Sequence, residues 1–148
     1  MAQEEKELLL KDLCARLPYG VSCYYETSDE SETMFGKLTF RAIESFATNK
    51  PLVSEKDNNM VYFYKVISIK PYLRPLSSMT EEECMELSKI RPFDDDVEAW
   101  KYVKTPVPLT IANIKHFDFF HSHHLDWRGL IEKGLALEAP EGMYKKGE

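Results

Sequence analysis

The spacing of apolar residues changes near residue 79, and this change constrains the fold more than any other feature of the chain. Across residues 20–70, apolar and polar side chains alternate in short runs, with Cys23 and Tyr25 as examples. That period of two is typical of half-buried strands. Beyond residue 79 the apolar residues recur at helical spacing, as Cys84 and Leu87 do. A β-rich stretch followed by helices predicts an α+β fold.

The chain begins with an amphipathic pattern. Residues 4–17 place Leu9 and Leu13 on one side of a helix, and glutamates open its first turn. A proline and a glycine follow and end the helix. The pattern predicts an N-terminal helix whose leucines are buried and whose polar side chains, including Asp12 and Arg16, face water.

The β-rich part is predicted as three or four antiparallel strands. One of them covers residues 34–46, with a bulge at Ala42 restoring its alternation. Residues 47–59 are expected to be a loop, and residues 60–70 form a further strand rich in aromatic and β-branched side chains. Together these elements predict a small curved antiparallel sheet or an SH3-like partial barrel over about residues 20–70.

The C-terminal part carries two clear helix starts. Thr80 and Glu83 have the spacing of a capping box, so a helix begins there. A further helix is expected from Thr110 into the histidine-rich stretch. Asp126 then caps a last short helix that ends at Gly134.

The length of 148 residues is that of one domain. We therefore expect a single domain over residues 1–148, with a β-rich part at 18–78 and a helical part at 79–148. Its helical elements are expected over about residues 79–134.

The charge of the chain bears on its partners. There are 19 Lys and Arg residues against 25 Asp and Glu residues, a net charge of −6. Binding through the phosphate backbone needs a positive surface, so the net charge does not support nucleic acid as the partner, and a protein is the expected one.

Cysteines and apolar runs predict the location. Three cysteines without C-x-x-C spacing fit reduced thiols. The start of the chain is acidic, whereas a secretory signal is basic, and no run approaches the roughly 20 apolar residues that span a bilayer. These features predict a cytoplasmic protein that does not bind membranes.

Two clusters have residue types that bind metals. Four histidines lie close together with two aspartates: His116, Asp118, His121, His123, His124 and Asp126. Imidazole and carboxylate bind zinc, iron or manganese, but the spacing matches no metal motif, and a helix C-terminus also favours histidine. An acidic group at residues 94–98 would suit Mg²⁺ or Ca²⁺, or cap a solvated loop.

Two further stretches are candidates for binding. Aromatic and basic side chains alternate from residues 62–65 through Lys70, Tyr72 and Arg74, a composition that stacks bases and neutralises phosphates. About half of those aromatic side chains must face the core. The other stretch is residues 126–128, where a tryptophan is a plausible anchor beside an arginine, although capping and packing explain it equally.

The candidate contact surface is accordingly a set of residues from these stretches. Its members are Tyr72, Arg74, His124, Asp126, Trp127 and Arg128. The chain has no P-loop, no G-x-G-x-x-G and no G-x-S-x-G, and we assign no catalytic residue, metal ligand or cofactor.

Three blocks are similar to a known family. They are KDLCARLPYGV (11–21), KPYLRPLSSMTEEE (70–83) and SHHLDWRGLIEKGLALEAPEGMY (122–144). In these blocks the chain resembles small uncharacterised proteins encoded by gut Bacteroidales and their phage and prophage elements. The resemblance implies an intracellular accessory protein of viral or mobile-element origin.

These observations lead to one preferred hypothesis and two alternatives. The preferred function is a non-catalytic interaction module. The first alternative is a metal-dependent hydrolase or nuclease that uses the cluster between His116 and Asp126, and the second is weak nucleic-acid binding by the β-rich half.

Overall fold

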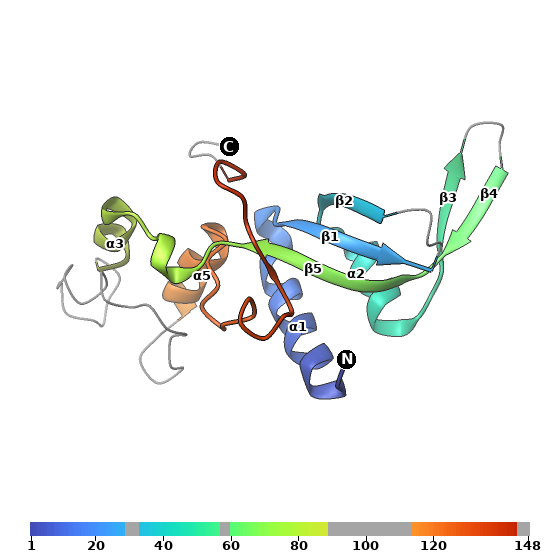
Figure 1. Cartoon of the computed structure of the whole chain (residues 1–148), viewed down its shortest axis with the longest axis horizontal. Helices are drawn as coiled ribbons and strands as arrows, with labels where there is room; N and C mark the ends of the chain where they lie inside the picture. The colour runs from blue at the N-terminus through green and yellow to red at the C-terminus, as the bar shows by residue number, and fades with distance from the viewer. Residues whose placement is uncertain (29–32, 57–59, 89–113, 145–148) are drawn as a thin grey trace. The chain divides into compact units, whose positions relative to one another are not determined.

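The computed structural model describes residues 1–28, 33–56, 60–88 and 114–144 (Figure 1). Its elements, in chain order, are α1 (Gln3–Arg16), η1 (Leu17–Tyr19), β1 (Ser22–Thr27), β2 (Thr33–Lys37), α2 (Phe40–Thr48), β3 (Leu52–Lys56), β4 (Met60–Tyr64), β5 (Val66–Leu73), η2 (Leu76–Ser78), α3 (Glu81–Ser88), α5 (Ile114–Ser122) and β6 (Leu137–Glu138). The predicted α+β class is confirmed. The acidic group at 94–98 lies outside the described residues.

Internal contacts divide the chain into two compact units, Met1–Tyr72 and Leu73–Glu148. The strand order is β2-β1-β5-β6, with β3 and β4 as a separate pair. The described residues contain no helix with the length and apolar character that a membrane crossing requires.

The N-terminal helix forms as predicted, with one correction. Leu9 and Leu13 are fully buried. Asp12 and Arg16, expected to face water, are also fully buried, and the Arg16 Nε donates to Asp12 Oδ2 at 2.7 Å. The expectation failed because polarity alone does not show that two charges four residues apart on a helix can neutralise each other.

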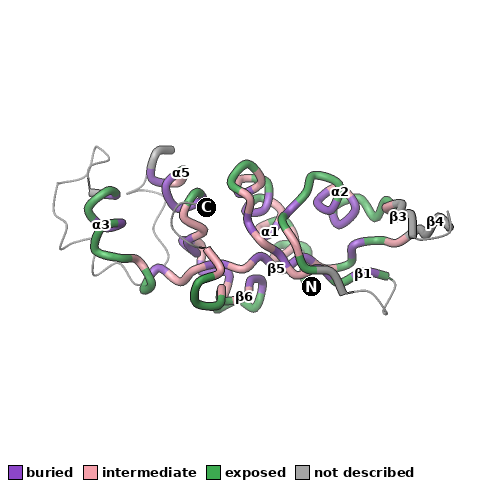
Figure 2. Tube along the Cα trace, turned by 90° about the horizontal axis from the view of Figure 1, so that it is seen from above, coloured by how far each residue is buried: buried purple, intermediate pink, exposed green. Residues whose placement is uncertain are grey.

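The first unit is built on an antiparallel sheet with β1 between β2 and β5. Cys23 pairs with Gly36 on one side and with Pro71 on the other. On the face that carries Cys23, Tyr25 and Ile69, the side chains are buried. Figure 2 shows α1 and α2 together on one side of this sheet, which is why that face is the core.

The prediction of one strand over residues 34–46 is wrong. The strand ends at Lys37, and Thr39 caps α2 by accepting from the Ala42 N–H at 3.2 Å. The change of phase attributed to a bulge is the start of helical spacing, since Ala42, Ile43 and Phe46 are all buried on one side of α2. A polar cap followed by i, i+1, i+4 apolar positions explains the helix.

The predictions for residues 47–59 and 60–70 also need correction. The loop contains β3, which pairs with β4 from Leu52–Tyr64 to Lys56–Met60. The single strand is two strands, because the chain leaves β4 after Tyr64 and resumes as β5 in another sheet. Neighbouring strands in sequence can pair with different partners, and composition does not show where one pairing stops.

The second unit has its own hydrophobic core. It consists of Leu76, Cys84, Leu87, Phe119, Phe120, Leu125 and Trp127, with Met79 and Phe117 packed against it. The chain enters this unit at Leu73, the end of β5, whose carbonyl accepts from the Ala139 N–H at 2.8 Å beside β6.

The predicted helix ends of this unit are partly confirmed. The capping box exists, because Thr80 Oγ1 accepts from the Glu83 N–H and Glu83 Oε1 accepts from the Thr80 N–H. The described part of the next helix, α5, ends at Ser122 as expected, and its predicted start lies outside the described residues. The last short helix is wrong: residues 126–134 form turns, since Gly129 has φ 75°, which interrupts a helix.

Candidate functional site

Arg74 links three segments of the second unit through its side chain. Its guanidinium donates two hydrogen bonds to Glu83, at 2.8 and 2.7 Å, in the bidentate geometry that makes such pairs strong. It also donates to the carbonyls of Ser78 at 3.1 Å and His123 at 3.3 Å. The side chain is 21% exposed, so most of it is engaged inside the unit.

The backbone of Arg74 strengthens this connection. Its N–H donates to the His124 carbonyl at 2.7 Å, and its carbonyl accepts from the Asp126 N–H at 2.8 Å. These bonds form a parallel bridge with Leu125 at their centre. Arg74 therefore fixes the chain after α5 to the end of β5, a structural role.

The partner carboxylate of Arg74 has a perturbed pKa. Burial by itself raises the pKa of Glu83, but the hydrogen bonds from Arg74 and from the Thr80 N–H, together with the Arg74 charge, outweigh it and hold the pKa at about 2. Glu83 is therefore a charged member of the capping box that is also the anchor of Arg74.

The four histidines make separate contacts. His116 is fully buried on α5, and the His121 Nε2 accepts from the Trp127 indole N–H at 3.0 Å. The His123 ring stacks on Phe119, with its Nδ1 2.9 Å from the Phe119 carbonyl oxygen.

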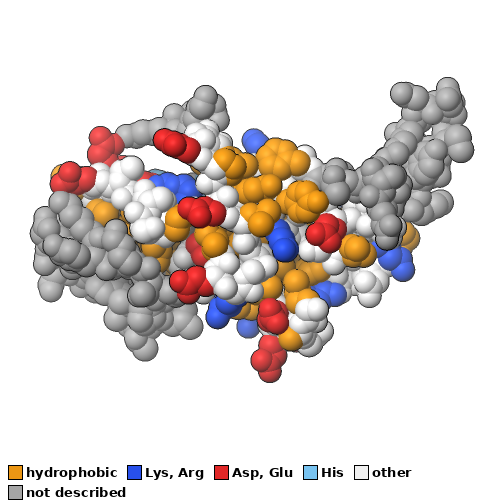
Figure 3. Space-filling model, in the orientation of Figure 1, with side chains coloured by type: hydrophobic (Ala, Val, Ile, Leu, Met, Phe, Trp, Pro, Cys, Tyr) orange, Lys and Arg blue, Asp and Glu red, His pale blue; other side chains and the backbone are white. Residues whose placement is uncertain are grey.

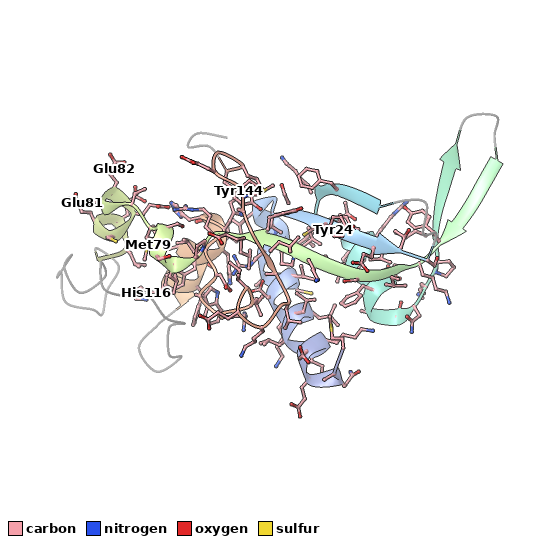
Figure 4. All side chains as sticks on the ribbon, in the orientation of Figure 1. Tyr24, Met79, Glu81, Glu82, His116 and Tyr144 are labelled. Carbon is pink, nitrogen blue, oxygen red and sulfur yellow. The ribbon has the colours of Figure 1, made fainter. Side chains whose placement is uncertain are left out.

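His124 differs from the others in its backbone. It has φ 58°, and its ring stacks on Tyr144 with centroids 3.8 Å apart. Figure 4 labels His116 and Tyr144 among the side chains of this unit. Among the residues that the structure describes, no group of three or more His, Cys, Asp and Glu side chains is placed to hold a metal ion.

The candidates at residues 126–128 are also engaged in the second unit. The Asp126 carboxylate accepts from the N–H groups of Leu130, at 2.8 Å, and Ile131, at 3.0 Å, and so caps the turns that follow. Trp127 is only 5% exposed, which leaves little surface for a partner. The half-buried Arg128 lies over its ring, 4.1 Å from the centroid.

Tyr72 belongs to the first unit. Its ring contacts that of Phe35 edge to face, with centroids 5.6 Å apart. Phe35 is 63% exposed, unusual for a large apolar side chain. This pair belongs to the sheet face opposite the core.

We call that surface the aromatic face. By strand alternation it consists of Ser22, Tyr24 and Glu26 of β1, Phe35 and Lys37 of β2, and Ser68, Lys70 and Tyr72 of β5. Tyr24, labelled in Figure 4, pairs with Phe35 on one side and with Lys70 on the other, which places an aromatic residue at the centre of the face.

The register explains how the rings meet. Ser22 pairs with Lys37, and Tyr72 lies two residues beyond Lys70 along β5. The small Ser22 side chain leaves space above β1, so rings from the two outer strands can meet across it. Lys37 lies beside Ser22 at a corner of the face, and Lys70 lies beside the central Tyr24.

On the opposite side of the sheet, Cys23 and Tyr25 of β1 and Ile69 and Pro71 of β5 are buried, whereas no residue of the aromatic face is fully buried. Ser22, Tyr24 and Tyr72 are half-buried, while Phe35, Lys37 and Glu26 are exposed. Figure 3 views the molecule from this side and shows hydrophobic side chains gathered over the sheet, with Lys and Arg side chains among them.

Sequence reasoning singled out Tyr72 and Lys70 but missed Tyr24, Phe35 and Lys37. The alternation of residues 21–26 already places Tyr24 opposite the buried cysteine. The alternation of the expected strand from residue 34 likewise places Phe35 on the side opposite Leu38, but the sequence did not show that β2 would lie beside β1.

The chain matches no family model, no curated protein and no solved structure. The resemblance to small proteins of gut Bacteroidales therefore stays a prediction.

Proposed function

We propose that this chain is a non-catalytic interaction module and that the aromatic face is its contact surface. The observation that carries the proposal is the exposure of Phe35, at 63%, next to Tyr72 and Tyr24 on a sheet whose other face is buried. Clustered exposed apolar side chains with a polar rim are characteristic of interaction sites. A sheet also holds such side chains rigidly, which reduces the entropy lost on binding.

The contacts in the second unit favour this surface over the other candidates. Arg74 and Asp126 bind groups of their own unit, and Trp127 is buried. Of the six residues that the sequence predicts as a contact surface, Tyr72 lies on the aromatic face.

A location in the cytoplasm and an origin in phage or mobile-element DNA are part of the proposal. The location is supported by three cysteines that form no disulfide with one another, Cys14, Cys23 and Cys84. The origin is supported by the three sequence blocks that resemble proteins of Bacteroidales and their phages.

The test is site-specific photo-crosslinking in a Bacteroidales cell extract. The photoreactive residue p-benzoylphenylalanine is placed either at Phe35 or at Phe40, and adducts are detected as species of reduced gel mobility. Phe40 is the matched control because it is 65% exposed but lies on α2, outside the sheet. We expect discrete adducts from position 35 and none, or only a diffuse background, from position 40.

Equal labelling from both positions would contradict the proposal, since it would reflect exposure alone. Absence of adducts at position 35 would contradict it as well. A Tyr72→Ala substitution in the chain carrying the probe at position 35 should weaken the adducts, because the edge-to-face contact orients the ring at position 35.

A further inference from the structure

We infer that the occupant of the aromatic face is a single-stranded nucleic acid. This inference rests on the proposed function, because it names the partner of the same surface. It follows from the combination of one exposed ring, two half-buried rings and two lysines on the same sheet face.

The rings supply the first part of the recognition. Phe35, Tyr24 and Tyr72 project from three neighbouring strands onto one face. Bases stack on aromatic side chains of such sheets when they are unpaired, and every base has a face that can stack. A duplex keeps its bases stacked on one another, so the rings favour a single strand.

The lysines supply the second part of the recognition, which is the contact with phosphates. Lys37 lies two residues beyond Phe35 on β2, and Lys70 lies two residues before Tyr72 on β5, so each ring of this pair has a lysine on its own strand. Neither ammonium group forms an ion pair with another described residue. Glu26 is the acidic side chain of the face, which therefore carries two positive charges and one negative charge.

This composition favours a nucleic acid over a protein. The centres of protein interfaces are poor in lysine, because a buried ammonium group is costly to desolvate, and the aromatic face places lysines directly beside its rings. Phosphates can be paired with the lysines while the bases contact the rings.

The net charge of the chain limits the electrostatic contribution to the affinity for nucleic acid. At −6 overall, the protein repels phosphates away from this face, so stacking must supply much of the affinity. Two lysine–phosphate contacts predict a shallow salt dependence, with a slope of about −1.4 in a plot of log affinity against log salt concentration.

The experiment measures the anisotropy of fluorescein-labelled single-stranded DNA and RNA of mixed sequence, about 12 nucleotides long, with the full chain. The same DNA annealed to its complement is the comparison, and the salt concentration runs from roughly 25 to 200 mM. We expect binding to the single strands that is tighter than binding to the duplex.

Four variants locate the binding. Phe35→Ala and Tyr24→Ala should each weaken it by between about fivefold and a hundredfold, the effect of losing one stacked base. Lys70→Gln should halve the salt slope to about −0.7. Phe40→Ala, the matched exposed phenylalanine, should leave affinity unchanged. Circular dichroism and thermal melting of every variant verify that the fold is intact.

Three results of the binding experiment would overturn the inference. They are no binding of single strands at the lowest salt concentration, equal affinity of wild type and Phe35→Ala, and affinity that does not change with salt. Nuclease treatment of the crosslinking extract separates the two proposals. Adducts at position 35 that survive the treatment would identify a protein partner, so the inference would fail while the proposed function stands.

Discussion

At the scale of the residue, Glu83 shows how a local motif takes on a tertiary role. Its carboxylate belongs to a capping box that any helix could contain, yet it also accepts hydrogen bonds from both terminal guanidinium nitrogens of Arg74. The combination keeps the pKa of Glu83 at about 2, although burial opposes ionisation.

This low pKa predicts a stability that depends on pH. The ordinary pKa of a glutamate is near 4.5, so the ionised form of Glu83 stabilises the folded state fully above that value, and this stabilisation is lost between about pH 4.5 and pH 2. Lowering the pH from 7 to about 3 should remove about 2 kcal/mol of the free energy of unfolding through Glu83 alone. Urea denaturation at pH 7 and at about pH 3 measures this change in the free energy of unfolding.

The variant Glu83→Gln tests the assignment. It should be less stable than the wild type at pH 7 by about 1–3 kcal/mol, because Arg74 loses its charged partner, and should lose less stability than the wild type on acidification. The exposed neighbour Glu82 provides the control, since Glu82→Gln should retain the wild-type pH dependence. An unchanged pH dependence in Glu83→Gln would contradict this account.

At the scale of the element, α2 is the clearest case in which local signals compete. Residues 38–46 satisfy a strand pattern if one bulge is allowed, and a helix pattern if Thr39 is a cap. The helix forms because it buries Ala42, Ile43 and Phe46 on the same side. The β2 strand thereby ends at Lys37, which leaves Phe35 and Lys37 at the edge of the aromatic face.

The cap predicts the effect of a single substitution. Thr39→Ala should lower the free energy of unfolding by about 1 kcal/mol, because the Ala42 N–H loses the side-chain oxygen that it donates to at 3.2 Å. Thr48→Ala, at the other end of α2, removes an exposed hydroxyl that donates to the Glu44 carbonyl, and should change stability by less than about 0.5 kcal/mol. Equal effects in urea denaturation would mean that Thr39 does not cap α2.

At the scale of the whole molecule, the two units each contain one buried thiol. Cys23 lies in the core of the first unit and Cys84 in that of the second, whereas Cys14 is exposed on α1. Burial raises the pKa of Cys23 to about 12, so its reactive thiolate form is suppressed as well as shielded.

The thiols therefore report on the integrity of both units. Ellman's reagent should react rapidly with one thiol in the native protein and with all three after unfolding in guanidinium chloride. Cys14→Ser should abolish the rapid reaction. A second fast thiol in native protein would show that one of the two cores is open to solvent.

Sequence patterns predicted the elements whose signals are local. The N-terminal helix, the capping box of Thr80 and Glu83, and the α+β order depend on residues within a few positions of one another. The same reasoning failed for β3 and for the ion pair of Asp12 and Arg16, because pairing and burial depend on what the rest of the chain places beside them.

The candidate site was likewise predictable only in part from the sequence. Composition identified Tyr72 and Lys70 as residues with binding chemistry. Only the tertiary structure brought Phe35 against Tyr72, since their contact depends on the register of three strands that are distant in sequence. Local chemistry is encoded by neighbours along the chain, whereas a surface is assembled from segments that meet only when the sheet forms.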